Sequence, residues 1–474
     1  MRDLMLVLDY DHLAARMAVR KLRAERICCR ILPWDIPEER ILQEDPGGII
    51  LCSRIDTPEI EISEGVLNFK GPVLALGAAC AAYNLALGGS NGALMQVDQL
   101  TGVEYADCPL LDNIEPEARL IRGIIPMQLH EDAAPIAKEK ESQSIIGYSY
   151  GGIKRFGLEL ELEAHDPDST RLLKNFALNI CGCTDWWDQD AFVHHAIDEI
   201  RAAAGDGNAL CIMTGGLYSN VTAMLAARAL GSRLICVFID TGFLQEDRES
   251  WFADFFTEKT GLPIIKKDHR ERFLQALKGI RGFMEKKRTI ESIMTIIRRD
   301  EQRNVPQLNA VIRGRSYMER LTEGEEVNGL RAGVLCVEPL RDLFMEEVCQ
   351  IGEYLGLPED LVSRQAIPAT GLALNVIGEV NEDKLSILRC ADGIFRHMME
   401  ERNQTRRLSA YFAELSQTPG GYTITLKAHT SSDTGISRAA RVPYDILEDC
   451  MQEIMTECPI VHHVVYDLTS VQDI

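Results

Sequence analysis

The chain has 474 residues, of which 46% are hydrophobic and 26% are charged. This length predicts two or three domains, and the composition is that of an ordinary soluble globular protein. Its 50 basic and 72 acidic side chains leave a formal charge of -22, which argues against a nucleic-acid or anionic membrane surface because phosphates would be repelled. We therefore expect a small molecule or another protein as the partner.

Cysteine usage and the absence of targeting signals predict a cytoplasmic protein. Fourteen cysteines without a secretory signal indicate reduced thiols rather than a disulfide framework. Cys181 and Cys183 have no second Cys or His pair at ligand spacing, so we expect structural thiols. No apolar run approaches the roughly 18 residues of a membrane helix, and the start "MRDLMLVLDY" is typical of a strand.

Residues 1–190 alternate short apolar strands with amphipathic helices. The segments "LMLVLDY", "GGIILCS" and "GPVLAL" predict strands, and "LAARMAVRKLRAE" and "ACAAYNLAL" predict helices. This alternation predicts a mostly parallel sheet with helices on both faces. The segment "FGLELELEA" alternates with a period of two, which predicts a strand with leucines on one face and glutamates on the other.

A second α/β unit is expected at residues 191–365, followed by a smaller α+β unit at 366–474. In the second unit, "ALCIMT" and "RLICVFID" predict strands, while "SNVTAMLAARAL" and "DRESWFADFFTEKTG" predict helices. The charged segment "MEKKRTIESIMTIIRRDEQRN" is expected to be an exposed helix. In the third unit, "GGYTITLKAHT" and "IVHHVVYDL" predict strands.

A strand, a Gly-Gly turn and a helix follow one another at residues 209–230. In a loop of the form Ser-Gly-Gly-x-Asp-Ser, the backbone wraps a phosphate chain, and its N–H groups and the helix dipole face the negative charge. The Asp helps to hold Mg²⁺, which bridges phosphate oxygens. The candidate nucleotide-binding residues are Thr214, Gly215, Gly216, Tyr218, Ser219 and Asn220. Because Tyr218 replaces the Asp, we expect a phosphate cradle that lacks the carboxylate needed to position Mg²⁺.

Asp240 is a further candidate, because it ends the strand "CVFID" at the carboxyl edge of the predicted parallel sheet. Ligands of open α/β sheets bind at this edge. Two roles are open for Asp240, which either faces a bound ribose or metal ion or caps a turn. For Lys287 and Arg288, a solvated charged face is the preferred interpretation.

The whole chain resembles the glutamine-hydrolysing GMP synthase family. The resemblance rests on several stretches in the same order, namely "LVLDYDHLAARMAVRKLRAERICCRILPWDI", "GGIILCS", "NICGC", "TGGLYSNVTAMLAARALGSRLICVFIDTGFL", "RERFLQALKG", "VEPLRDLFMEEVCQIGEYLGLP", "GLALNVIGEV" and "HHVVYDL". It implies a class I glutamine amidotransferase domain at 1–190, an ATP pyrophosphatase domain at 191–365 and a C-terminal dimerisation domain at 366–474. The implied reaction adenylates XMP with ATP and displaces AMP with ammonia from glutamine.

Several side chains that this reaction needs are missing. The resemblance places the amidotransferase nucleophile at Gly77 and the catalytic His and Glu at Glu161 and Glu163, so only Glu163 matches. Cys80, one helical turn after Gly77, is expected to be a packing residue. The family's Phe-Pro-Gly-Pro-Gly-Leu turn survives in part, at Pro368 and in "GL" after it. The closing lysine and acidic tail are absent from "YDLTSVQDI".

Three functional hypotheses follow. The first is a catalytically inert paralogue that binds ATP or another purine nucleotide and acts as a regulator or partner subunit, either as a homodimer or with another protein. The second is an enzyme, either a GMP synthase-type ligase that uses free ammonia or an ATP pyrophosphatase with another acceptor. The third is a ligand-free scaffold dimer, which would follow if Tyr218 filled the phosphate pocket.

Overall fold

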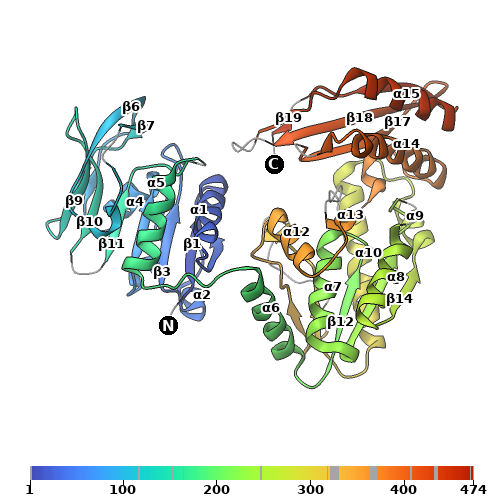
Figure 1. Cartoon of the computed structure of the whole chain (residues 1–474), viewed down its shortest axis with the longest axis horizontal. Helices are drawn as coiled ribbons and strands as arrows, with labels where there is room; N and C mark the ends of the chain where they lie inside the picture. The colour runs from blue at the N-terminus through green and yellow to red at the C-terminus, as the bar shows by residue number, and fades with distance from the viewer. Residues whose placement is uncertain are drawn as a thin grey trace. The chain divides into compact units, whose positions relative to one another are not determined.

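The computed structural model describes residues 3–115, 118–151, 154–163, 165–245, 248–317, 319–320, 330–362, 371–405, 408–431, 436–469 and 471–472. The chain divides into two compact units, residues 1–191 and 192–474 (Figure 1). The expected boundary between residues 365 and 366 lies outside the described residues, as does Pro368. None of the described helices has the length and hydrophobicity of a membrane-spanning segment.

Unit 1 is built on a nine-stranded sheet in the order β2-β1-β3-β4-β11-β10-β9-β6-β7. The first five strands pair in parallel, and the pairs from β11 to β7 are antiparallel. The strands are Met5–Asp9 (β1), Cys29–Pro33 (β2), Gly48–Cys52 (β3), Val73–Leu76 (β4), Met95–Tyr105 (β6), Ala118–Ile124 (β7), Ala133–Glu139 (β9), Ile145–Tyr150 (β10) and Arg155–Leu158 (β11), with a separate pair Ser90–Asn91 (β5) and Met127–Gln128 (β8). β1, β3 and β4 are buried along their whole length, as expected of parallel strands covered on both faces.

The helices of unit 1 cover both faces of this sheet. They are His12–Ala24 (α1), Glu38–Glu44 (α2), Glu64–Asn68 (α3), Ala78–Ala86 (α4) and Pro167–Lys174 (α5), with a 3₁₀ turn Pro109–Leu111 (η1) and a π-helical turn Asn175–Ile180 (η2). α1 and α5 lie side by side (Figure 1), and Lys21 Nζ on α1 donates to Asp166 O at 2.9 Å. α5 begins where the Asp166 side chain accepts from the amides of Asp168 and Ser169, which satisfies donors that have no partner inside the helix.

Unit 2 begins with a five-stranded parallel sheet in the order β14-β13-β12-β15-β16. Its strands are Asn208–Met213 (β12), Leu234–Asp240 (β13), Ile264–Asp268 (β14), Leu308–Ile312 (β15) and Leu335–Val337 (β16). Its helices are Gln189–Ala204 (α6), Leu217–Leu230 (α7), Arg248–Thr260 (α8), Arg270–Leu277 (α9), Phe283–Asn304 (α10), Met345–Tyr354 (α12) and Glu359–Val362 (α13), with 3₁₀ turns Gly231–Arg233 (η3) and Leu372–Asn375 (η4).

The expected exposure of the charged helix α10 is wrong for one of its faces. Ile290, Ile293 and Ile297 are buried in the core, because residues three and four apart lie on the same side of a helix. The helix itself is confirmed, as is the α8 helix that ends before Gly261.

The rest of unit 2 is a mostly antiparallel sheet backed by two helices (Figure 1). The strands are Ala410–Thr418 (β17), Gly421–Ser431 (β18), Ile436–Ala439 (β19), Val461–Tyr466 (β20) and Val471–Gln472 (β21), and the helices are Glu382–Glu401 (α14) and Tyr444–Glu457 (α15). β20 pairs in parallel with β18. One hydrophobic core runs without interruption from β12 through η4 to this sheet.

Candidate functional site

Gly77 forms a sharp turn between β4 and α4, at the carboxyl edge of the parallel part of the sheet. Its backbone angles are φ +66° and ψ -139°, a conformation that strongly favours glycine. A Cβ atom placed on Gly77 would lie 2.1 Å from the carbonyl oxygen of Ser53. The turn has the geometry that holds a nucleophile in related folds, but a side chain at this position meets the backbone of a neighbouring loop.

The loop Ser53–Ile55 covers this turn and takes up its hydrogen-bonding groups. Ser53 Oγ donates to Leu76 O at 2.9 Å and accepts from the Ala79 amide at 2.8 Å. The Ala78 amide donates to Arg54 O at 3.2 Å. Acyl transfer needs amides at the start of such a helix to stabilise an oxyanion, and here those amides already have partners within the chain.

Glu161, at the expected position of the catalytic histidine, holds the same loop from the other side. Its Oε1 accepts from the Ile55 amide at 2.7 Å, and its Oε2 lies 3.0 Å from Arg122 Nε. Glu163 lies 4.0 Å from the Arg122 guanidinium and is about half exposed. Glu161 therefore stabilises the loop that covers the turn through Oε1, while its Oε2 pairs with Arg122 of β7.

The sequence predicts that "FGLELELEA" is one strand with its glutamates on a polar face, but the strand ends at Leu158. The prediction is wrong for Glu159, which is buried. Glu159 is 4% exposed, and its carboxyl group accepts from the Ile125 amide at 3.2 and 3.3 Å. Burial raises the pKa of Glu159 to about 9. The alternation fails because β10 pairs with residues 155–158 only, and the chain then leaves the sheet. Cys80 is fully buried in α4, as expected of a packing residue.

The turn between β12 and α7 contains the residues that the sequence predicts to bind phosphate. Gly215 has φ +79°, and Gly216 is extended and lies at the N-terminus of α7. Within the described residues, the amides of Gly215 to Ser219 donate no hydrogen bond. Ser219 Oγ donates to Gly216 O at 2.8 Å. A helix N-terminus with unengaged amides is a favourable place for a negative charge.

Tyr218 and Asn220, the two departures from the family pattern, have different environments. The Tyr218 hydroxyl hydrogen-bonds with Ser316, and burial raises its pKa to about 12. The side chain is thus directed to the segment that follows β15. Asn220 is 1% exposed, and neither atom of its side-chain amide has a hydrogen-bond partner among the residues that the structure describes. An unsatisfied buried amide is costly, so it is expected where a ligand completes the site.

Asp240 caps a turn and pairs with an arginine. Its Oδ1 accepts from the Gly242 amide at 2.8 Å, and its Oδ2 lies 3.1 Å from Arg270 Nε. Among the described residues, no three His, Cys, Asp or Glu side chains are grouped so that they could hold a metal ion. With Tyr218 in place of a carboxylate, the residues at this edge of the sheet do not fit Mg²⁺.

Lys286 is a buried cation that the sequence pattern did not single out. It is 1% exposed, and its ammonium donates to Ala373 O and Val376 O. Burial lowers its pKa to about 8. Lys287 next to it is partly exposed and lies 3.9 Å from Glu291, which fits the solvated face expected for it. In a run of charged residues, the sequence does not show which lysine is buried, because this depends on which face of the helix packs against the core.

Comparison with known proteins agrees with the resemblance. No protein-family model matches the chain. The glutamine-hydrolysing GMP synthase of Caldicellulosiruptor saccharolyticus is 30% identical to it, over 99% of this chain and 98% of the relative. That of Caldanaerobacter subterraneus subsp. tengcongensis is 28% identical with the same coverage. The solved NMN synthetase of Francisella tularensis aligns with 42% of this chain and 81% of its own, at 15% identity and a TM-score of 0.33. The chain belongs to the glutamine-hydrolysing GMP synthase family.

Proposed function

We propose that this chain is a GMP synthase family member that does not hydrolyse glutamine, and that it binds a purine nucleotide at Gly215–Ser219 as a regulator or partner subunit. Nucleotide binding is carried by one observation, the set of α7 amides that donate no hydrogen bond within the described residues. Successive amides and the helix dipole favour a phosphate group there. The buried and unsatisfied Asn220 beside them supports the same assignment.

Loss of glutamine hydrolysis is supported by the covered turn at Gly77. Glycine carries no nucleophile, and a cysteine Cβ at this position would meet Ser53 O at 2.1 Å. The loss of adenylyl transfer is supported by Tyr218 and by the engaged Asp240. Without a metal ion on the phosphates, several kcal/mol of charge stabilisation is lost, which corresponds to several powers of ten in rate.

An ammonia-dependent ligase, or an ATP pyrophosphatase with another acceptor, is the second candidate. It is favoured by the presence of Thr214, Ser219 and Asp240 at the positions that the family uses.

To decide between the two candidate functions, purified full-length protein is incubated with ATP, Mg²⁺ and XMP, with either ammonium or glutamine. Our proposal predicts no AMP or pyrophosphate above the rate of the blank. Release at an enzyme-like rate would favour the second candidate.

Nucleotide binding is tested by melting-temperature titrations with ATP, ADP, AMP, XMP and GMP, because a ligand of the native state raises the melting temperature. Two variants at Gly216 form a matched pair, since no atom of the described residues lies within 4 Å of a Cβ placed there. Gly216→Asp places a carboxylate at the helix N-terminus, where it caps the amides and competes with phosphate. We expect Gly216→Asp to abolish the shift and Gly216→Ala to retain most of it. If no nucleotide shifts wild-type protein, the scaffold hypothesis replaces ours.

A further inference from the structure

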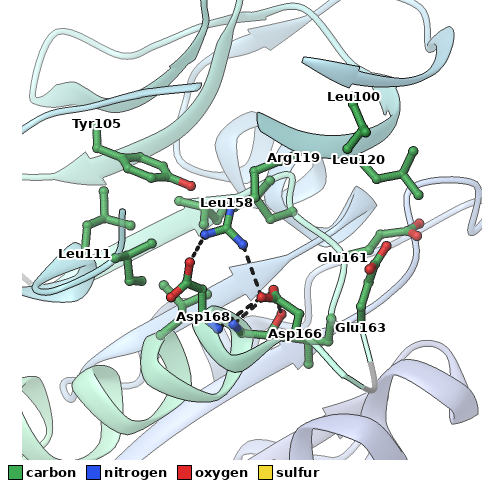
Figure 2. Close-up of a pocket in the computed structure, with 15 residues that line it drawn as sticks. Leu100, Tyr105, Leu111, Arg119, Leu120, Leu158, Glu161, Glu163, Asp166 and Asp168 are labelled. Carbon is green, nitrogen blue, oxygen red and sulfur yellow. Dashed lines mark hydrogen bonds and ion pairs between the residues drawn. The ribbon is translucent and has the colours of Figure 1, made fainter. Parts of the chain in front are cut away.

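Unit 1 contains a cavity of about 200 Å³ between the β6–β7 hairpin, the start of α5 and the segment that follows β11 (Figure 2). The residues that line it include neither Gly77 nor the loop Ser53–Ile55, but they include Glu161, which accepts from the Ile55 amide, so the cavity adjoins the covered turn without containing it. An apolar cavity of about 150 Å³ is large enough to bind a benzene ring. The volume is therefore sufficient for a small organic molecule.

Most of the cavity wall is aliphatic. Leu111, Leu160 and Leu172 line it from three different segments. Leu100 and Leu120 lie on the hairpin, with 71% and 38% of their surface exposed. Large apolar side chains exposed at the edge of a cavity are typical of a ligand site, because a bound molecule removes them from water.

The charged groups of the cavity disfavour an anion. Among the described residues, Arg119 is the one cation that lines the cavity, and it is paired with Asp166 at 3.2 Å and with Asp168 (Figure 2). Glu161 and Glu163 also line the cavity, and Arg122 lies 3.0 Å from Glu161 and 4.0 Å from Glu163, while Arg171 lies 3.3 Å from Asp168. The four carboxylates still outnumber the three guanidinium groups that pair with them, which disfavours a phosphate or carboxylate ligand and favours an ammonium group.

A polar group inside the cavity lacks a good partner. The Tyr105 hydroxyl points toward the Arg119 guanidinium, but neither Tyr105 Oη nor Arg119 Nε makes a hydrogen bond of good geometry within the described residues. In Figure 2, Tyr105 lies across the cavity from Glu161 and Glu163. Buried polar atoms are usually satisfied, so this pair is suited to a ligand hydroxyl, which can both donate and accept.

We propose that this cavity binds a small amphipathic amine. The apolar body lies among the leucines, the ammonium group meets the half-exposed carboxylate of Glu163, and a hydroxyl at the other end satisfies Tyr105 and Arg119. This site is independent of the nucleotide cradle in unit 2.

Three probes with the same aromatic ring test the charge and the hydroxyl separately. They are 2-phenylethylamine, tyramine and 3-phenylpropanoate, titrated into the full-length protein by calorimetry at constant ionic strength. We expect saturable binding of 2-phenylethylamine, tighter binding of tyramine by roughly 2- to 10-fold, and binding of the carboxylate at least about 10-fold weaker. At ten times its Kd, tyramine should raise the melting temperature by about 2–4 °C.

Two variants test whether the amine binds in this cavity. Glu163→Gln, at a half-exposed position, should weaken amine binding several-fold, and Leu120→Trp should abolish it by filling the cavity. The matched controls are Glu131→Gln and Leu42→Trp, which change exposed residues of unit 1 outside the cavity. No saturable amine binding, equal affinity for amine and carboxylate, or equal effects of variants and controls would each overturn the proposal.

Discussion

Replacing Gly77 by alanine should destabilise unit 1 more than any single added methyl group normally does. A non-glycine residue in this backbone conformation costs about 1–3 kcal/mol. The new Cβ would also lie 2.1 Å from Ser53 O, so the loop Ser53–Ile55 has to move. Such overpacking costs about 1–3 kcal/mol, and each loop hydrogen bond lost costs about 1 kcal/mol. With one loop hydrogen bond lost, the expected loss for Gly77→Ala is therefore about 3–7 kcal/mol by these terms together.

Gly182 provides the control, because it has φ +74° and no atom lies within 4 Å of a Cβ placed on it. Gly182→Ala should thus carry only the backbone cost, about 1–2 kcal/mol. Three of the four tryptophans lie in unit 1, so guanidinium unfolding followed by tryptophan fluorescence reports mainly on this unit. The Gly77→Cys variant is assayed in parallel for release of glutamate from glutamine, and none is expected. Equal losses for the two alanine variants, or glutamine hydrolysis by Gly77→Cys, would show that the loop does not block the turn.

Substitutions at three further positions test other parts of the molecule. Because burial raises the pKa of Glu159 from 4.5 to about 9, the contribution of this group to the free energy of unfolding is greatest below pH 4.5 and is lost as the pH rises to 9. Glu159→Gln should remove this pH dependence and stabilise the chain at pH 7 by up to about 3 kcal/mol in urea unfolding. A difference between variant and wild type that stays constant from pH 5 to pH 8 would refute the assignment. Glu161→Leu should lower the free energy of unfolding by about 1–3 kcal/mol, because the Ile55 amide loses its hydrogen-bond acceptor. Glu161→Gln keeps that acceptor and should lower the free energy of unfolding by less. Equal losses for the two variants would contradict this reasoning. Asn220→Val should stabilise the nucleotide-free chain by about 1–3 kcal/mol and should weaken the nucleotide-induced shift in melting temperature. If the variant is less stable than wild type, the Asn220 amide has hydrogen-bond partners in the native state.

The sequence alone determined the order of strands and helices, because hydrophobic periodicity is a local property. The five-residue apolar segments of β1 and β3 and the amphipathic α1 form where the pattern places them. The turn at Gly215 and Gly216 was also predictable, since a Gly-Gly pair between a strand and a helix leaves few alternative backbone paths. The assignment of the nucleophile position to Gly77 came from the sequence resemblance alone, and it stays a prediction.

Only the tertiary structure decided what surrounds these positions. Glu161 reaches the Ile55 amide across 106 residues of sequence, and Ser53 reaches Ala79 across 26. Periodicity cannot report such contacts, because they depend on how strands are ordered in the sheet and on where each strand ends. The same reason explains why Glu159 and Lys286, polar residues in polar runs, are buried. Strand β11 ends early and one face of α10 meets the core, and each of these facts is a property of the packed molecule.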